Sequence, residues 1–585
     1  MVSPAMDAPS RRPRAPTASF DSLILAAVLA ECRPLVGARA GRVLQPAAAD
    51  LAVGLRWGGG AGALRVSLEP RWTRLVLARR APDGDATPFA QMLRSRLEGA
   101  TLRAVEAPPF ERVVTVRFET LEGPQDLVVE LMGRFGNVIL LADGLVVGAL
   151  RASAGRRRAT PGRPYEPPPS PGRTPATVTA DDLVAAASPD PAGDAPQPAW
   201  RAVMAAAGGI GPAHAWEICL RAGVDPARPL EREDAVRLAE AARELGAAVL
   251  AGAFSPALYR DALGEPAAYA AFPMRLFAGL SAEPASMSQA VEAVVSRTAS
   301  VARLEETRAS LAASVAQASA RVARALDAVA TDERAAADAE RLRAAGELLL
   351  AYQAVVVPGA SEVEVTGYDG RPLRIPLDPA LGPVQNAQAY FRRYARAQAA
   401  RRRLPARRAA LEAERAYLEA AAAAIAQAED ADDLWEIEQD LIAAGLRRRA
   451  RPAVAPRAAD AGRAFDLPGG VRARVGRSAR ENDRLTFDVA GPDDLWLHAR
   501  GMPGAHVVLL TGGRPPTDEA VRAAAALAAY YSAGRAAARV PVDVTARRHV
   551  RRMRGGRPGQ VTYSHERTLV VRPGLPPRGR AGPAA

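Results

Sequence analysis

ENDRLTFDVAGPDDLWLHARGMPGAHVVLL, residues Glu481 to Leu510, is the stretch that decides the fold of the C-terminal part of this chain. Its apolar side chains alternate with polar ones through residues 485–489, and again through residues 495–497. A period of two is typical of half-buried strands, so we predict one strand in each segment. Glycine, proline and aspartate at residues 491–494 and 501–504 supply the turns that follow them.

Hydrogen-bonding side chains gather around the ends of these predicted strands. They are not spread along a surface, which is the layout of a binding site. The residues that we expect to line the site are Asn482, Asp483, Arg484, Trp496, His498 and His506. For Trp496 the alternative is that the ring packs the domain, because large aromatic side chains are often part of a core.

The same stretch resembles the C-terminal NFACT-R domain of the NFACT family, the bacterial RqcH-type and eukaryotic ribosome quality-control factors. The motifs that carry the resemblance occur in the family's order: Gly476-Arg477, Asn482-Asp483, Asp494-Leu495-Trp496-x-His498 and Pro503-Gly504-x-His506-Val507-Val508. It continues through residues 528–532, 540–543 and 557–559. The resemblance implies that the six polar and aromatic residues named above face RNA.

The length, net charge and cysteine content of the chain limit the number of domains, the kind of partner and the compartment. A chain of 585 residues is too long for one core and predicts several domains, and a net charge of +13 with a pI near 10.4 favours a polyanionic partner. Cys32 and Cys219 are the two cysteines, which leaves no disulfide framework or zinc cluster and is typical of a reducing cytosol. The apolar run at residues 23–30 is too short to span a bilayer, so we expect a cytoplasmic protein.

The N-terminal part is predicted to be an α+β domain over residues 20–173, behind a disordered tail at residues 1–19. A helix capped by Asp21 or Ser22 comes first. The predicted strands cover residues 63–68, 73–78, 113–118, 127–131, 138–141 and 145–150, with a hairpin turn at Asp143-Gly144. SFDSLILAAVLAEC at residues 19–32 and ELMGRFGNVILLADG at residues 130–144 resemble the family's NFACT-N domain, which is itself distantly similar to formamidopyrimidine-type DNA glycosylases.

Two short motifs in this domain carry the functional hypothesis. Glu111 and Arg112 stand where the RqcH-type family has an Asp-Arg pair implicated in holding transfer RNA, and a second family motif corresponds to Glu130-Leu131-Met132, followed by Arg134. The resemblance implies a tRNA-binding role for all six. An arginine can bridge phosphates while a neighbouring carboxylate accepts hydrogen bonds from base amino groups. The alternative for the first pair is an ordinary surface ion pair.

Residues 174–285 are predicted to be a mainly helical domain. GGIGPAHAWEICLRAGVD, at residues 208–225, is typical of a helix-hairpin-helix with a tight turn at Gly209-Ile210-Gly211. Such a turn can offer backbone N–H groups to a phosphate. We expect His214 beside it to lie on the surface.

Residues 286–450 are predicted to form an antiparallel coiled-coil arm. Apolar residues recur in steps of three and four from Val301 to Val329, and Leu404, Leu411, Leu418 and Ile425 are seven apart. Pro405 is expected at a kink or a helix start, and a β-hairpin is expected near residues 354–384. The arginines that we expect to contact ribosomal RNA are Arg392, Arg393, Arg401, Arg402 and Arg403. Their alternative role is a solvated helix face.

A linker over residues 447–462 precedes the NFACT-R domain at residues 463–574, and residues 575–585 form a tail. We expect a mixed α/β fold here, with an alanine-rich helix at residues 517–533. Its histidines match no zinc-ligand spacing, so neither metal nor cofactor is predicted. A second basic cluster comprises Arg547, Arg548, Arg551, Arg552, Arg554 and Arg557.

The leading hypothesis is therefore an α+β multidomain factor of ribosome quality control. The resemblance implies that it binds a stalled large ribosomal subunit with peptidyl-tRNA and recruits alanyl-tRNA for template-free alanine tailing, as a monomer and without catalysing a reaction itself. Two alternatives stay open: a nucleic-acid enzyme of the glycosylase type and a fibronectin-binding surface adhesin. Against the first, the chain has Ser19-Phe20-Asp21 where such enzymes begin with Pro-Glu.

Overall fold

The computed structural model describes residues 16–80, 84, 87–151, 159–170, 172–187, 197–448 and 462–576. Most of the predicted N-terminal tail, of the 447–462 linker and of the C-terminal tail lies outside these residues. The chain divides into two compact units, residues 1–301 (unit 1) and residues 302–585 (unit 2).

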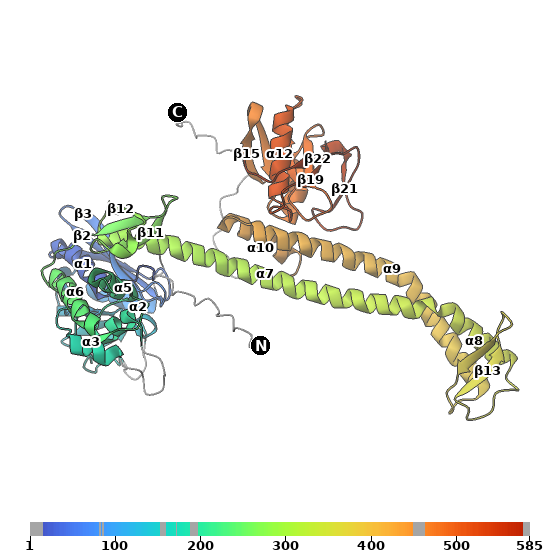
Figure 1. The fold of residues 1–585 in the computed structure, drawn as a ribbon, viewed down its shortest axis with the longest axis horizontal. Coiled ribbons are helices and arrows are strands. Elements are labelled where there is room, and N and C mark those ends of the chain that lie inside the picture. Colours follow the sequence, from blue (N-terminus) through green and yellow to red (C-terminus); the bar gives the residue numbers. More distant parts are fainter. Residues whose placement is uncertain are drawn as a thin grey trace, which may run out of the picture. The chain divides into compact units, whose positions relative to one another are not determined.

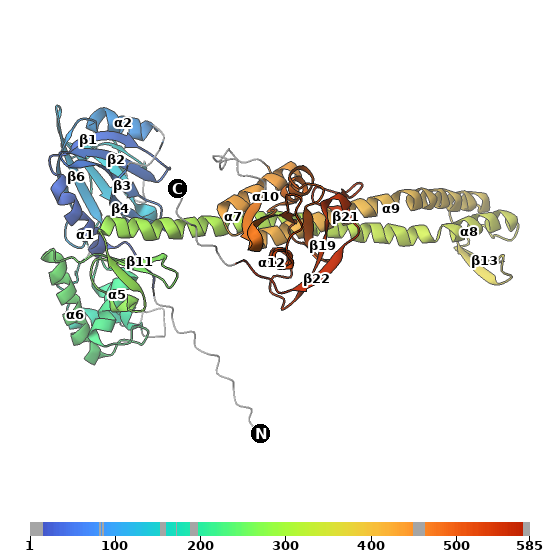
Figure 2. The same ribbon diagram turned by 90° about the horizontal axis from the view of Figure 1, so that it is seen from above.

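A nine-stranded antiparallel sheet dominates unit 1, with the strand order β4-β3-β2-β1-β5-β6-β7-β8-β9. Figure 2 shows β1, β2, β3 and β4 side by side in it. Its strands are β1 (Arg39–Leu44), β2 (Asp50–Trp57), β3 (Gly60–Ser67), β4 (Arg74–Ala78), β5 (Thr101–Glu106), β6 (Val113–Thr120), β7 (Gly123–Glu130), β8 (Asn137–Ala142) and β9 (Leu145–Ala149). Each of the six strands predicted from the sequence is present. The prediction missed β1, β2 and β5, in which glycine, alanine and arginine residues obscure the apolar alternation.

Helices cover this sheet and extend its core. They are α1 (Ser22–Cys32), α2 (Pro88–Leu97), α3 (Ala180–Ala187), α4 (Ala199–Ala206), α5 (Pro212–Ala222) and α6 (Arg232–Leu250), with short 3-10 turns at η1 (Arg33–Leu35) and η2 (Gly133–Phe135). One continuous apolar core includes Leu23 of α1, Phe118 of β6 and Leu238 of α6, all with 1% exposure or less. The predicted α+β and helical segments are therefore packed as one body.

The prediction of a mainly helical segment is wrong for its C-terminal end. Residues 257–284 form a three-stranded sheet of β10 (Ala257–Arg260), β11 (Pro266–Ala270) and β12 (Ser281–Pro284), with the 3-10 turn η3 (Arg275–Phe277) before the last strand. The Asp261 side chain accepts hydrogen bonds from the backbone N–H groups of Leu263 and Glu265, which closes a tight hairpin. Leu258 and Tyr259 are both buried on β10, so the short apolar run is a strand.

Asp21 is the polar centre of unit 1. As predicted it caps α1, with Oδ1 accepting hydrogen bonds from the N–H groups of Leu23 and Ile24 at 3.1 and 3.2 Å. Its other oxygen accepts from Gly211 N at 2.7 Å and lies 2.6 Å from Nδ1 of His214. His214 is 2% exposed, so the expected surface position is wrong; the carboxylate of Asp21 holds the imidazole inside.

Two long helices pack side by side in unit 2 (Figure 1). α7 (Met287–Ala337) begins in unit 1 and is followed by α8 (Ala339–Ala351), the β13 (Glu362–Thr366) and β14 (Pro372–Pro376) hairpin, α9 (Pro383–Gln427) and α10 (Ala431–Ala443). The predicted seam is confirmed from Leu311 onward: Leu311, Val315, Ala318 and Val322 are buried in one core with Leu418 and Ile425, and Val329 packs with Leu404. Val301, where the predicted seam begins, is 51% exposed. Pro405 lies inside α9, so no helix starts there.

The C-terminal part of unit 2 is a six-stranded antiparallel sheet with the strand order β15-β16-β18-β17-β19-β22, and α12 (Asp518–Tyr530) packs on it. The strands are β15 (Arg463–Leu467), β16 (Val471–Val475), β17 (Leu495–Ala499), β18 (Val507–Leu510), β19 (Val540–Ala546) and β22 (Arg567–Val571), with short turns η4 (Pro468–Gly470) and η6 (Arg547–His549) and a separate pair, β20 (Val550–Arg552) and β21 (Val561–Tyr563). Every strand pair of the six-stranded sheet is antiparallel, so the domain is α+β and the predicted mixed α/β sheet is wrong.

The strand predicted at residues 485–489 is wrong. Residues 479–484 form helix α11 (Ala479–Arg484), capped by Ser478, and η5 (Leu485–Val489) continues it as a π-helical turn. Ala490 N donates to Leu485 O at 3.0 Å, and both side chains are buried. In this π-helical turn the two buried side chains, Leu485 and Ala490, are five residues apart. The alternation of apolar residues between Leu485 and Phe487 therefore does not reflect a strand.

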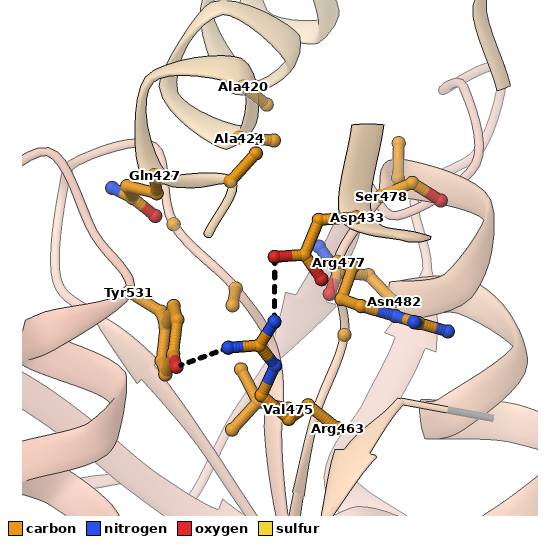
Figure 3. A pocket seen from close by; sticks show the side chains of 15 residues that line it. Ala420, Ala424, Gln427, Asp433, Arg463, Val475, Arg477, Ser478, Asn482 and Tyr531 are labelled. Atoms are coloured by element: carbon orange, nitrogen blue, oxygen red, sulfur yellow. Dashed lines mark hydrogen bonds and ion pairs between the residues drawn. The ribbon is translucent and has the colours of Figure 1, made fainter. Parts of the chain in front are cut away.

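Arg463 of β15 attaches this sheet to the helical corner between α9 and α10. Its guanidinium donates to Asp433 at 2.8 Å and to Asp430 at 2.7 Å, and it also pairs with Glu429. Figure 3 shows the guanidinium between Asp433 and Tyr531. The cavity around it holds about 50 Å³, which admits a few water molecules and excludes a nucleotide.

Replacing Asp21 by asparagine tests the buried Asp21–His214 contact, since asparagine is as good a helix cap as aspartate. Burial alone raises the pKa of Asp21, but the charge and hydrogen bond of His214, with the Gly211 and Ile24 N–H groups, lower it overall. The ionised form is therefore favoured by folding, so the stabilisation is complete above about pH 4 and is lost as pH falls through the lowered pKa.

We expect Asp21→Asn to reduce the free energy of unfolding of unit 1 by about 1–3 kcal/mol at pH 7, with a smaller difference at pH 3.5. Urea titrations of the full chain at both pH values measure it. Asp181→Asn, on the exposed first turn of α3, is the control. An equal loss at the two pH values would show that the Asp21 charge is not what stabilises the junction.

Candidate nucleic-acid interface

The two N-terminal motifs lie together at one end of the sheet. β6 and β7 pair with Val113 opposite Glu130, and Leu131 N donates to Arg112 O at 2.8 Å. Residues 111–112 and residues 130–132 are thus neighbours across a strand pair, although eighteen positions separate them in the sequence. The geometry makes a single candidate site of two separate sequence signals.

The members of this site differ in how far they are available to a ligand. Arg112 and Arg134 are exposed, and Glu111 and Met132 are half-buried. Glu130 is 1% exposed and accepts a hydrogen bond from Tyr165 at 2.8 Å, while Leu131 is fully buried. The exposed arginines are therefore placed to meet a ligand, and the buried pair positions the strand end beneath them.

The loop that carries Glu111 has an unusual backbone. Phe110 has φ 63°, a left-handed conformation that bulky residues rarely adopt, and its side chain is 4% exposed. A Cβ added to Gly209 would lie 2.2 Å from Phe110 O, so only glycine lets the α4–α5 turn approach so closely. Ser170 Oγ donates to Glu111 at 2.5 Å from the other side. Such strain is typical of loops whose exact position matters.

A groove of about 440 Å³ opens beside Glu111. It runs between α1, the turn after β5 and the end of α6, and its walls include Arg33, Arg103, Val36 and Leu250. Val36 is 55% exposed and Leu250 58% exposed, so the groove has apolar walls with charged groups at its rim. Its size and mixed lining are sufficient for a nucleotide or a short peptide segment.

The α4–α5 turn differs from the sequence-based expectation in one respect. Gly211 N–H, at the start of α5, donates to Asp21 and is not available to a phosphate. The carboxylate already occupies the position that an anion takes at a helix N-terminus. This end of the hairpin therefore serves the fold of unit 1.

The predicted arginines of the arm are exposed on α9: Arg392, Arg393, Arg401, Arg402 and Arg403. None of these five forms an ion pair with a carboxylate of the described residues within 4.0 Å, whereas Arg408 nearby pairs with Glu333 at 2.6 Å and Glu412 at 3.0 Å. Positive charge without a local counterion is what attracts a polyphosphate chain.

The C-terminal motif residues lie mainly inside their domain. Trp496 is fully buried, and His506 and Asn482 are 2% and 9% exposed. His498 is half-buried and stacks on Trp496 with ring centroids 5.6 Å apart. The packing role that was the alternative for Trp496 fits this position, and all three side chains are buried within the domain.

Asn482 and His506 form a hydrogen-bonded junction between three elements. Asn482 Oδ1 accepts from His506 N at 3.0 Å, His506 O accepts from Gly476 N at 3.0 Å, and His506 Nδ1 lies 2.8 Å from Thr486 Oγ1. Burial lowers the pKa of His506 to about 3 and also lowers the pKa of His498. Both rings are neutral at physiological pH and supply no positive charge to a phosphate.

Exposed charge in this domain is partly neutralised. Asp483 accepts three hydrogen bonds from Arg552, at 3.0, 3.1 and 2.8 Å. Arg548 pairs with Asp493 at 2.8 Å, and Arg557 lies 3.5 Å from Glu414. Arg547 donates to the backbone oxygens of residues 486 and 487. Arg551 and Arg554 remain exposed without an ion pair to a described residue, as does Arg484 apart from a 3.9 Å contact with Glu481.

Metal ligands and membrane-spanning helices are both missing from the described residues. Among them, no three histidine, cysteine, aspartate or glutamate side chains are grouped as metal ligands. Within the described part of the chain no helix combines the length and apolar character that a membrane crossing needs.

Sequence reasoning missed Phe110, Ser170 and Phe135, which all border the N-terminal site. Ser170 is remote in sequence, and only the fold brings it to Glu111. Phe110 adjoins Glu111 and Phe135 adjoins Arg134, so an aromatic residue next to a predicted motif was the available signal.

Comparisons with known proteins cover nearly the whole chain. The NFACT N-terminal and middle domains match residues 21–456, and the NFACT protein RNA binding domain matches residues 462–555. The protein described as Rqc2 homolog RqcH from Streptococcus pneumoniae serotype 2 (strain D39 / NCTC 7466) is 28% identical over 577 residues, which are 95% of this chain and 98% of that protein.

Two shorter matches come from Streptococcus suis. The Rqc2 homolog RqcH of strain 05ZYH33 is 36% identical over 233 residues, which are 40% of this chain and 42% of that protein. The structure of the C-terminal part of a fibronectin/fibrinogen-binding protein from Streptococcus suis is 29% identical, with a TM-score of 0.37, and the match covers 46% of this chain and 96% of that chain.

The structural role of the C-terminal motif can be tested at Gly476. A Cβ on this residue would lie 2.1 Å from Asn482 Oδ1, so alanine must displace the side chain that joins α11 to β18. We expect Gly476→Ala to destabilise the C-terminal domain by about 2–3 kcal/mol, measured by urea unfolding or hydrogen exchange. Gly574→Ala, where a Cβ meets no atom within 4 Å, is the control and should be silent. Equal stability of the two variants would contradict the role of this junction.

Proposed function

Because the chain belongs to the NFACT family, we propose that it acts in ribosome-associated quality control. In this proposal the protein binds a large ribosomal subunit that still carries peptidyl-tRNA and recruits alanyl-tRNA. The C-terminal alanine tail that results marks the stalled chain for removal. Its full-length similarity to a protein named Rqc2 homolog RqcH supports this assignment.

The observation that carries the tRNA part is the convergence of Glu111–Arg112 and residues 130–132 at one sheet end. Arg112 and Arg134 are exposed for phosphate contacts, and the half-buried Glu111 is fixed by Ser170. A carboxylate held beside arginines accepts hydrogen bonds from base amino groups while it repels a misplaced phosphate. The site therefore suits one strand of a structured RNA in a defined position.

The arm carries the ribosomal RNA part of the proposal. Exposed arginines on α9 without carboxylate partners among the described residues provide affinity that depends on charge and little on sequence. Such contacts can hold the factor on the subunit, while the N-terminal site selects the tRNA. The two functions are thereby separable by mutation.

We infer a factor that positions its RNA ligands and leaves peptide bond formation to the ribosome. The glycosylase alternative requires a reactive residue near the start of the first helix. Here Asp21 is 3% exposed and its two oxygens already accept bonds from three backbone N–H groups and pair with His214. An acid with no access to substrate cannot serve as a general acid or nucleophile.

Three finer assignments complete the proposal. The α4–α5 pair acts as a helix-hairpin-helix whose role is to support the Glu111 loop through Gly209. The domain boundaries at residues 20–173, 174–285, 286–450 and 463–574 describe segments with distinct tasks. The protein works in the cytoplasm as a monomer on the subunit.

Removing Glu111 and Arg112 tests the tRNA role. We expect Glu111→Ala with Arg112→Ala to abolish alanine tails on a nonstop reporter, scored by mass spectrometry, while co-sedimentation with large subunits stays largely intact. Arg117→Ala with Asp126→Ala, an exposed ion pair at 2.9 Å on the same two strands, is the matched control. Loss of both tailing and co-sedimentation, or of neither, would count against a tRNA-specific site.

Neutralising three arm arginines tests the ribosomal RNA contact. Arg401→Gln, Arg402→Gln and Arg403→Gln together should weaken subunit binding and reduce the slope of log affinity against log salt by about 0.7–0.9 for each phosphate that is no longer neutralised. Arg408→Gln with Arg415→Gln is the control, because both arginines pair with glutamates. A salt slope equal to that of the wild type would reject the arm as the contact.

A further inference from the structure

The turn at residues 132–136 presents an exposed aromatic ring next to the candidate tRNA site. Phe135 is 48% exposed, and the Arg134 guanidinium lies over its ring at 4.6 Å from the centroid. The turn follows Leu131, whose N–H bonds to Arg112 O, so the ring and Arg112 belong to the same sheet end. A single exposed apolar residue is common on protein surfaces. Phe135 differs because it lies beside Arg134 and at the sheet end that carries Arg112.

A single arginine holds the turn rigidly. Nη1 of Arg151 donates to Arg134 O at 3.2 Å and to Gly136 O at 2.9 Å, and Nη2 reaches Leu68 O at 3.3 Å. Asn137 Oδ1 accepts from Arg151 N at 3.0 Å and Nδ2 donates to Arg151 O at 2.9 Å, which fixes the arginine in turn. The backbone under Arg134 and Phe135 is thus set before any ligand binds.

Glycine completes this arrangement. A Cβ at Gly136 would lie 2.7 Å from Glu130 O, so the turn folds tightly against the end of β7. The turn is therefore already ordered before RNA binds, so binding loses little conformational entropy there, and this favours affinity for RNA.

We propose that Phe135 with Arg134 is a stacking platform for an unpaired base of the bound RNA. An aromatic ring and a guanidinium plane both stack on the π-face of a base, and the exposed Arg112 nearby supplies charge for the adjoining phosphate. A base within a duplex has no free face, so the platform selects single-stranded or loop nucleotides. This inference rests on the proposed function and adds the structural class of nucleotide that the N-terminal site takes.

The test uses the full-length protein and three labelled probes: a tRNA, an RNA hairpin with an unpaired loop, and a blunt RNA duplex of equal length. We expect Phe135→Ala to weaken binding of the tRNA and the hairpin by about ten-fold and to leave duplex binding unchanged. Its salt slope should equal that of the wild type, because stacking releases no counterion. Phe135→Trp should restore binding.

The matched control is Leu121→Ala. Leu121 is fully exposed in the turn at the opposite end of the same β6–β7 hairpin, so its loss removes apolar surface without touching the platform. It should bind all three probes as the wild type does. A 2-aminopurine base in the hairpin loop gives a direct readout, since stacking on Phe135 quenches its fluorescence in the wild type and not in Phe135→Ala.

The outcomes separate this inference from the proposed function. If the wild type binds tRNA and Phe135→Ala binds it equally well, the platform is refuted and the tRNA role stands. Failure of Phe135→Trp to rescue binding refutes stacking in the same way. If the wild type ignores tRNA and hairpin alike, the proposed function fails and the platform with it.

Discussion

The buried carboxylate of Asp21 is the constraint on which the rest of unit 1 depends. It caps α1 and holds His214 and Gly211 at the start of α5, and Ser22 next to it donates both its N–H and its hydroxyl to Gly209 O. A charge so deep is tolerable only when its oxygens are satisfied. The turn that these bonds fix then receives the backbone of Phe110, so a buried hydrogen-bond network centred on Asp21 determines where Glu111 stands.

The C-terminal domain illustrates how a strong sequence motif can describe a fold instead of a ligand. Asn482, Trp496 and His506 are remote from solvent, and their hydrogen bonds and ring contacts join α11, β17 and β18. Because the pKa values of both histidines fall, the cluster stays neutral and compatible with a dry interior. The arginines that this domain exposes around the cluster include Arg484, Arg551 and Arg554.

The spacing of apolar residues in the sequence correctly predicted those helices and strands in which buried side chains recur at a regular interval. The α7 seam from Leu311 to Val329 and the strand at residues 495–499 follow directly from apolar spacing. It failed where a local feature outweighs the pattern: the Ser478 cap and the π-turn convert residues 485–489 to helix, and the Asp261 turn converts residues 257–270 to a hairpin. Likewise no pattern along the chain could place Ser170 beside Glu111 or His214 against Asp21, because those contacts are products of tertiary packing.

The distribution of paired and unpaired arginines gives the chain two kinds of positively charged surface. In the C-terminal domain Arg548 and Arg552 are neutralised by aspartates, and a neutralised guanidinium contributes little long-range attraction. On α9 the arginines at residues 401–403 keep their full charge and act over about a Debye length, which suits capture of a large polyanion. At the N-terminal site charge is combined with a fixed carboxylate and a rigid turn, so geometry adds selectivity to attraction. Under the proposed function, the first kind of surface would serve to find the ribosome and the second to choose among RNAs, and separate residues supply them.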